Sequence, residues 1–179
     1  MITDDARKSF ETIFAQAART RLAPAAGDSC EIVAVDPQGR DETLGPRALV
    51  LTIASIAFRL LFVLHFHDDE TTREYYLGAA ANRTLSEVFT ETGNLCCGYM
   101  NQQLVAHFPD LGMSTPYELN SRCVDYIGEL KPNHVWAYDV LVGGVARLGV
   151  TLCVCTKAPL DFSVDVVEET QSEGELELF

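Results

Sequence analysis

The pattern of apolar and polar positions divides the chain into helices and strands. Apolar side chains recur every three or four positions over residues 4–22, and Pro24 and Gly27 follow, which predicts a first helix there. The segment Cys30–Val35 is typical of a short strand, and the turn residues 36–39 end it. The pattern over residues 71–80 predicts a short helix.

The stretch Ala48–Phe66 is nearly all apolar and just long enough to span a bilayer. Arg59 lies in its middle, and a lone arginine at bilayer depth costs at least ~2.5 kcal/mol. The β-branched residues Val50, Ile53 and Val63 favour extended structure. We therefore expect two adjacent buried strands, about 48–54 and 57–66, and no membrane partner.

A second long helix is predicted over residues 84–108. Thr84 and Glu87 have the spacing of a capping box, and Pro109 ends the pattern. Two or three strands are then predicted, at about 121–126, 134–142 and 146–156, with a Gly143-Gly144 turn between the last two. The order lacks βαβ alternation, so the expected fold is α+β: a two-layer sandwich with long helices packed on a largely antiparallel sheet.

Charge and composition narrow the class of protein. The chain has 13 basic and 26 acidic residues, a net charge of −13, which argues against nucleic acid and anionic membranes as partners. Acids concentrate after residue 160, so we expect one domain over residues 1–160 and an acidic, partly mobile extension over 161–179. The N-terminal residues lack the apolar core of a secretory signal, which predicts a cytoplasmic protein whose six cysteines are thiols.

The second long helix carries the candidate chemistry. Projected at 100° per residue, it has an apolar face that predicts core contacts for Leu85, Val88, Phe89, Thr92, Leu95, Cys96, Tyr99 and Met100. The opposite stripe holds Glu87, Glu91, Asn94, Gly98 and Asn101. A solvated face would explain the stripe alone, but Gly93 and Gly98 each cost about 1 kcal/mol in a helix. We expect Gly98 to let another backbone approach closely.

Glu91 and Asn94 are three residues apart and point the same way. The carboxylate can accept charge-assisted hydrogen bonds from a lysine or arginine. The carboxamide both donates and accepts, so it can orient a water molecule without ionising. That combination suits phosphoryl transfer, in which the positioning of a water does much of the work. We expect both side chains to be exposed and free of other side-chain partners.

The residues Glu91-Thr-Gly-Asn94-Leu95, followed by Gly98 and Ser114-Thr115-Pro116, resemble the chemotaxis phosphatases of the CheC/CheX/FliY family. The resemblance is closest to the CheX type, which has one E-x-x-N motif. It implies hydrolysis of the aspartyl phosphate of a CheY-like response regulator in chemotaxis or related two-component signalling. Glu87 stands where members of the family often have serine or aspartate, and its capping role can explain it.

The resemblance also implies roles for the stripe. Glu91 would pair with the active-site lysine of the regulator, and Asn94 would orient the attacking water as the second catalytic residue. Glu87, Gly98 and Asn101 would belong to the binding surface. The chain would need no cofactor of its own, because the regulator supplies Mg²⁺, and it would form a homodimer through its sheet.

Several alternatives stay open. A second function class is a non-catalytic binding module of the same fold, which docks a signalling, flagellar or pilus partner. His65 and His67 could chelate a metal from one strand face, although no third ligand is identifiable. Cys96 and Cys97 could form a redox pair, but a buried structural thiol is the simpler interpretation. The alternating Trp136, Tyr138 and Val140 fit either the core or a dimer surface.

Overall fold

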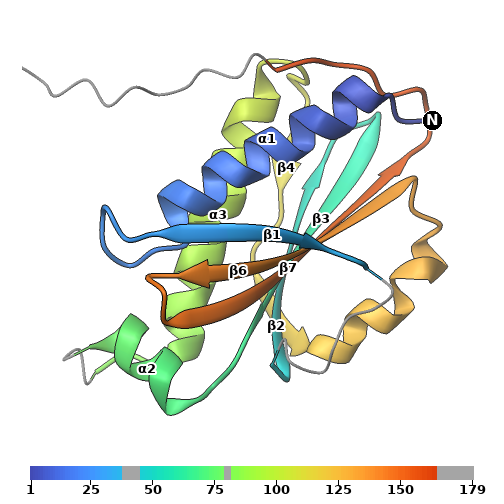
Figure 1. Ribbon diagram of the computed structural model, residues 1–179. Helices are drawn as coiled ribbons and strands as arrows, with labels where there is room; N and C mark the ends of the chain where they lie inside the picture. Colours follow the sequence, from blue (N-terminus) through green and yellow to red (C-terminus); the bar gives the residue numbers. More distant parts are fainter. Residues whose placement is uncertain (38–44, 79–81, 165–179) are drawn as a thin grey trace, which may run out of the picture.

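A computed structural model describes residues 1–37, 45–78 and 82–164 of the chain. A seven-stranded sheet forms the domain, in the order β1-β6-β7-β3-β2, with β4 and β5 both paired to the outer edge of β2 (Figure 1). All pairings between these strands are antiparallel. The strands are β1 (Cys30–Val35), β2 (Arg47–Ala54), β3 (Phe58–Phe66), β4 (Gly112–Met113), β5 (Tyr117–Asn120), β6 (His134–Val142) and β7 (Ala146–Thr156). The helices are α1 (Asp4–Arg21), α2 (Glu70–Leu77), α3 (Leu85–Val105) and the 3₁₀ helix η2 (Ser121–Leu130).

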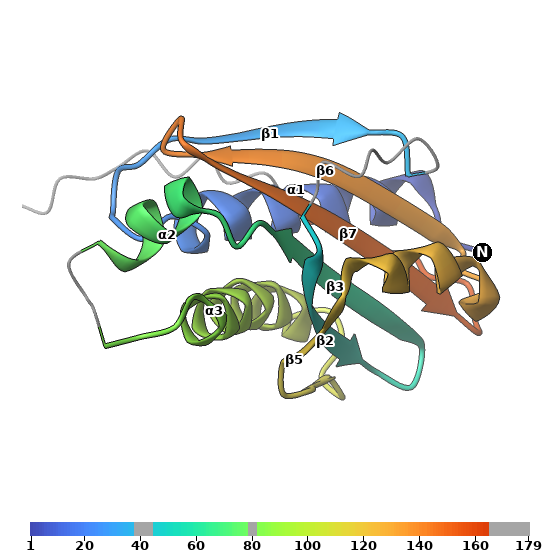
Figure 2. The same ribbon diagram turned by 90° about the horizontal axis from the view of Figure 1, so that it is seen from below.

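The main core lies between the sheet and the two long helices, α1 and α3. Phe14 of α1 stacks on Tyr138 of β6, and Phe89 of α3 stacks on Phe66 of β3 with ring centroids 4.2 Å apart. On the other face of the sheet, η2 packs Cys123 and Val124 against a small apolar cluster of β2 and β3. Figure 2 shows α3 and η2 on opposite sides of these two strands. The predicted α+β sandwich with a largely antiparallel sheet is therefore confirmed.

Most predicted helices and strands are present, and they begin and end close to the predicted residues. The apolar stretch Ala48–Phe66 forms the hairpin β2–β3, in which Arg47 pairs with Phe66 and Ala54 with Arg59. Gly143 and Gly144 make the tight turn between β6 and β7 with φ of +61° and +67°, a backbone conformation that favours glycine. Among the described residues, none of the helices is both long enough and apolar enough to cross a membrane.

The prediction of a strand over residues 121–126 is wrong. The strand is Tyr117–Asn120 instead, paired to β2, and the chain turns directly into η2. Asn120 caps that helix, because its side-chain oxygen accepts a hydrogen bond from the Arg122 N–H at 3.0 Å. The apolar residues of this segment reach the small cluster from a helical turn rather than from a strand.

The segment after β7 returns along α1. Phe162 is buried against Phe10 and Phe108, and the Val164 N–H donates to Ser9 Oγ at 3.0 Å. Residues 161–164 of the predicted acidic extension thus pack on the domain (Figure 1), and residues 165–179 lie outside the described part. Trp136, with its Nε1 donating to Glu11, belongs to the core rather than to an exposed face.

Candidate functional site

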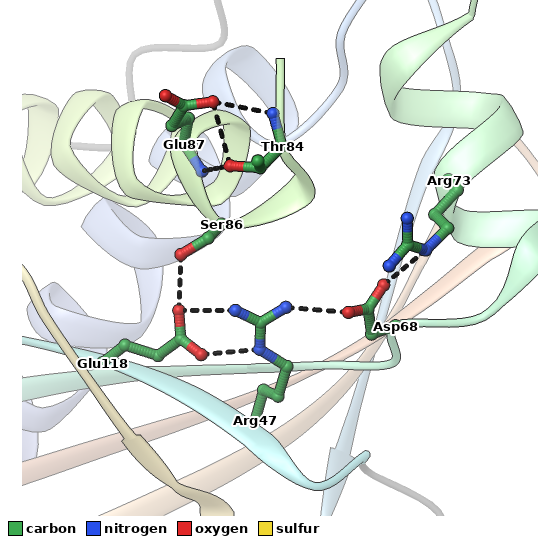
Figure 3. A network of polar contacts seen from close by, with 7 residues as sticks. All are labelled: Arg47, Asp68, Arg73, Thr84, Ser86, Glu87 and Glu118. Atoms are coloured by element: carbon green, nitrogen blue, oxygen red, sulfur yellow. Dashed lines mark hydrogen bonds and ion pairs between the residues drawn. The ribbon is translucent and has the colours of Figure 1, made fainter. Parts of the chain in front are cut away.

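A capping box defines the start of α3. Thr84 Oγ1 accepts a hydrogen bond from the Glu87 N–H at 3.3 Å, and Glu87 Oε2 accepts from the Thr84 N–H at 2.7 Å (Figure 3). The hydrogen bonds that the Glu87 carboxylate accepts from the Thr84 N–H and the Thr84 hydroxyl lower the pKa of the Glu87 carboxyl. The structure therefore gives Glu87 the capping role that its spacing from Thr84 predicts.

The first half of the predicted polar stripe lines an open groove. Glu87, Glu91 and Asn94 are exposed, and together with Ser86 and Thr90 they form one wall. The segment Met113–Pro116 between β4 and β5 forms the other wall. Two hydrogen bonds hold this segment to β2, from the Ser114 N–H to the Thr52 carbonyl at 2.9 Å and from the Thr52 N–H to Ser114 Oγ at 3.0 Å. The groove thus brings Pro116 beside the E-x-x-N residues, although it lies far from them in the sequence.

The second half of the stripe does not line this groove. Gly98 and Asn101 are half-buried and lie further along α3. Asn101 Oδ1 is buried without a hydrogen-bond partner among the described residues. The structure therefore separates these two residues from Glu91 and Asn94, with which the helical projection grouped them.

Glu91 is not free of partners, so that expectation is wrong. Arg83 Nη2 lies 2.6 Å from Glu91 Oε2. Arg83 precedes the capping residue and so lies outside the helix, where a helical projection cannot place it. Both side chains are about half exposed, and ion pairs of this kind contribute only about 0–1 kcal/mol. Asn94, as expected, is exposed and makes no side-chain hydrogen bond with the described residues.

The close approach of α3 to the sheet occurs at Gly93, not at Gly98. A Cβ on Gly93 would overlap Leu49 Cδ2 of β2, whereas a Cβ on Gly98 would meet no atom within 4 Å. The buried side of the helix is correspondingly rotated from the projected one. Leu95, predicted in the core, is 47% exposed, and Cys97 is buried in its place.

A network of charged side chains fixes the start of α3 to the sheet (Figure 3). Ser86 Oγ donates to Glu118 Oε2 at 2.6 Å, and Glu118 receives two hydrogen bonds from Arg47, at 2.5 and 2.8 Å. Arg47 Nη1 also lies 2.9 Å from Asp68 Oδ2, and Asp68 Oδ1 lies 2.6 Å from Arg73 Nε. The Arg47 guanidinium lowers the pKa of the Glu118 carboxyl. Sequence reasoning missed this network, which joins β2, β5, α2 and α3.

Three of the other candidate chemical groups, His65, Cys96 and Cys97, are buried. His65 is buried, with Nε2 3.0 Å from Thr151 Oγ1. Across the described ranges, no group of three or more His, Cys, Asp or Glu residues could hold a metal ion. Cys96 and Cys97 are both buried, and burial raises the pKa of the Cys97 thiol to about 12. Both thiols therefore stay protonated near neutral pH, which favours a structural role over a redox one.

Comparison with known proteins shows the fold. No family model and no curated protein matches the chain. Among solved structures, the CheX protein of Vibrio vulnificus matches at a TM-score of 0.54 and 13% identity, over 83% of this chain and 99% of that one. The CheX of Borrelia burgdorferi, in a CheX-CheY-BeF3-Mg complex, matches at 0.56 and 13%, over 85% and 99%. A CheC-like superfamily protein from Shewanella matches at 0.52 and 11%, over 86% and 99%.

These similarities show the fold alone: the chain has the fold class of the CheX and CheC-like structures. Within that class, its fold matches the CheX structures over most of its length. The fold resemblance that the E-x-x-N motif and the order of elements predict is therefore confirmed.

Proposed function

We propose that this chain is a phosphatase that hydrolyses the aspartyl phosphate of a CheY-like response regulator. The observation that carries the proposal is the exposed Asn94 beside Glu91, on a capped helix that forms one wall of a groove with Pro116 on the other wall. The Borrelia structure with the same fold is a complex of CheX with CheY, and this supports a regulator of that kind as the partner.

In the proposed reaction, Asn94 enters the phosphorylated site of the regulator. Its amide oxygen and N–H groups hold a water molecule in line with the bond between phosphorus and the aspartyl oxygen. The water oxygen bonds to phosphorus while that bond breaks, the aspartate leaves as a carboxylate, and the water proton passes to solvent or to the released phosphate. Since the amide does not titrate, it keeps this role across a wide range of pH.

Glu91 would supply binding rather than chemistry. Its carboxylate would exchange Arg83 for the active-site lysine of the regulator, and so hold the regulator in register with Asn94. The Mg²⁺ would stay on the regulator, so the chain would need no cofactor. Glu87 would act mainly through the cap, while its exposed position on the groove wall leaves it at the binding surface. Gly98 and Asn101, beyond the groove, would contact the partner only at its periphery.

We also propose a homodimer formed through the sheet. β1 is an end strand of the sheet, and Val33 in its middle is 59% exposed. Unpaired strand edges of this kind are usually covered or paired with another chain. Light scattering at micromolar concentration should give twice the chain mass, and a monomer mass would contradict the proposal.

A non-catalytic binding module is the second candidate function. The Arg83–Glu91 ion pair favours it, because the only titratable member of the E-x-x-N pair is already engaged. Such a module would use the same groove to dock a signalling, flagellar or pilus partner without hydrolysis.

Phosphate release from a phosphorylated CheY-like regulator with Mg²⁺ separates the two functions. Wild type should accelerate release, and Asn94→Ala should lower the rate about 10²–10³-fold, if the lost contact resembles an oxyanion-hole donor. Gln102→Ala, an exposed change on the same helix outside the groove, should leave the rate unchanged. Tight binding to a beryllofluoride-loaded regulator without faster release would support the binding module instead.

A further inference from the structure

A second surface, distinct from the groove, gathers positive charge. Arg59, Lys131 and Lys157 all line a pocket of about 350 Å³ between the β2–β3 turn, the end of β7 and the end of η2. The pocket shares no lining residue with the groove of Glu91 and Asn94. We call it the cationic pocket.

The cations of this pocket have no counter-charge among the described residues. No acidic residue lines it, and the three exposed side chains make no ion pair or hydrogen bond with the described residues. By contrast, Arg73 and Arg83 each have a carboxylate oxygen at 2.6 Å. The chain has twice as many acids as bases, so three cations in one pocket without a partner in the described part of the chain indicate a surface for an acidic ligand.

The same pocket also exposes apolar side chains. Ile56, at the tip of the β2–β3 turn, is 91% exposed, and Leu130 at the end of η2 is 44% exposed. A ligand that satisfies both features carries carboxylates interspersed with large apolar groups. That composition describes an acidic amphipathic peptide rather than a small anion.

We propose that residues 165–179 of this same chain bind the cationic pocket. They contain no basic residue, and six acids: Asp165, Glu168, Glu169, Glu173, Glu175 and Glu177. The last five residues, Glu-Leu-Glu-Leu-Phe, alternate acidic and apolar side chains before the final aromatic ring. Charge and apolar complementarity thus point to one occupant.

Tethering favours this occupant over any free peptide. The segment begins eight residues after Lys157, and its fifteen residues can extend up to about 50 Å, enough to reach the pocket from Val164. Because the segment belongs to the same chain, its effective concentration at the pocket is in the millimolar range typical of short tethers. Even a weak site of exposed ion pairs is then largely occupied by the chain's own segment.

Zero-length coupling with a carbodiimide tests the proposal on the full chain. The chain has only three lysines, Lys8, Lys131 and Lys157, and two of them line the pocket. Lys8 is an internal control, because its neighbour Ser9 accepts a hydrogen bond from Val164, the residue just before the acidic segment. A segment without a preferred partner would couple mainly to Lys8. We expect mass spectrometry to find its carboxylates coupled mainly to Lys131 and Lys157 within one chain.

Two charge reversals complete the test. Arg59→Glu should lower coupling to both pocket lysines about threefold to fivefold, the range of one or two exposed ion pairs, and 0.5 M salt should act likewise. Arg122→Glu, an exposed change outside the pocket, should leave coupling to the pocket lysines unchanged. Coupling mainly to Lys8, coupling between differently isotope-labelled chains, or coupling unchanged by Arg59→Glu would each overturn the proposal.

Discussion

Arg83 and Glu91 form an ion pair across the first two turns of α3, with Nη2 2.6 Å from Oε2. The carboxylate that borders the groove is therefore already engaged before a partner arrives. Both side chains face solvent, so a second cation can displace the first at little cost.

Arg83→Ala should therefore improve engagement of a phosphorylated regulator. We expect kcat/KM for phosphate release to rise about 1.4-fold to fivefold, because an exposed pair is worth about 0.2–1 kcal/mol. Glu91→Gln should lower the same constant by raising KM. The gain in Arg83→Ala should shrink in 0.5 M salt, where surface charges are screened.

Arg122→Ala is the matched control for this prediction, since it removes an exposed arginine outside the groove. A fall in kcat/KM for Arg83→Ala would show that Arg83 contacts the regulator itself, and would contradict its role as a competitor for Glu91.

The two glycines of α3 should respond to alanine with opposite signs. Gly98→Ala should raise the free energy of unfolding by up to about 1 kcal/mol, since the helix gains propensity and no atom blocks the methyl group. Gly93→Ala should lower it by about 1–3 kcal/mol, because the methyl group overlaps the buried Leu49. Urea unfolding followed by circular dichroism measures both. An equal stabilisation in the two variants would rule out the close packing at Gly93.

The cap of α3 gives a third prediction. Thr84→Ala should lower the free energy of unfolding by about 0.5–2 kcal/mol, because the Glu87 N–H loses its acceptor. Thr84→Ser keeps the oxygen and serves as the control, with a much smaller loss expected. Thermal melts of the three proteins at one concentration decide the matter, and indistinguishable melts for alanine and serine would contradict the capping role.

The Arg47–Glu118 contact predicts a specific dependence of stability on acid. The folded-state pKa of Glu118 lies below its ordinary value of 4.5, chiefly because it accepts hydrogen bonds from Arg47. A lowered carboxyl pKa stabilises the folded protein above pH 4.5, and this contribution disappears as pH falls through the folded-state value. Glu118→Gln should therefore lose less stability than wild type between pH 6 and pH 3.

Glu129→Gln, a change at an exposed carboxylate of η2, is the control and should follow the wild-type pH curve. Urea midpoints at half-unit pH steps provide the comparison. Parallel curves for wild type and Glu118→Gln would show that the Arg47 contact does not stabilise the fold.

Local signals in the sequence predicted much of the fold. The capping box of Thr84 and Glu87, the glycine turn at 143–144 and the apolar hairpin of β2 and β3 all depend on residues close together in the chain. Those elements appear where they were expected. The groove wall of Glu91 and Asn94 follows from helical spacing in the same way.

The features that were missed depend on distant residues or on the exact rotation of a helix. Arg47 and Glu118 are 71 positions apart, and no local pattern marks their contact. Gly93 faces the sheet, and Leu95 faces solvent, because α3 packs against both α1 and β2. A projection onto an idealised helix assumes one buried face, and so it does not predict how the helix turns when two neighbours pack against it.

The pairing of β3 with β7 bears on how quickly the molecule forms. Phe66 pairs with Leu148 and Phe58 with Thr156, partners separated by 82 and 98 positions in the sequence. Such distant contacts form only after the chain has lost the entropy of closing a large loop. Folding should therefore take milliseconds to seconds rather than microseconds. α3 lies in the sequence between β3 and β7, so the central sheet is completed only after most of the polypeptide has left the ribosome.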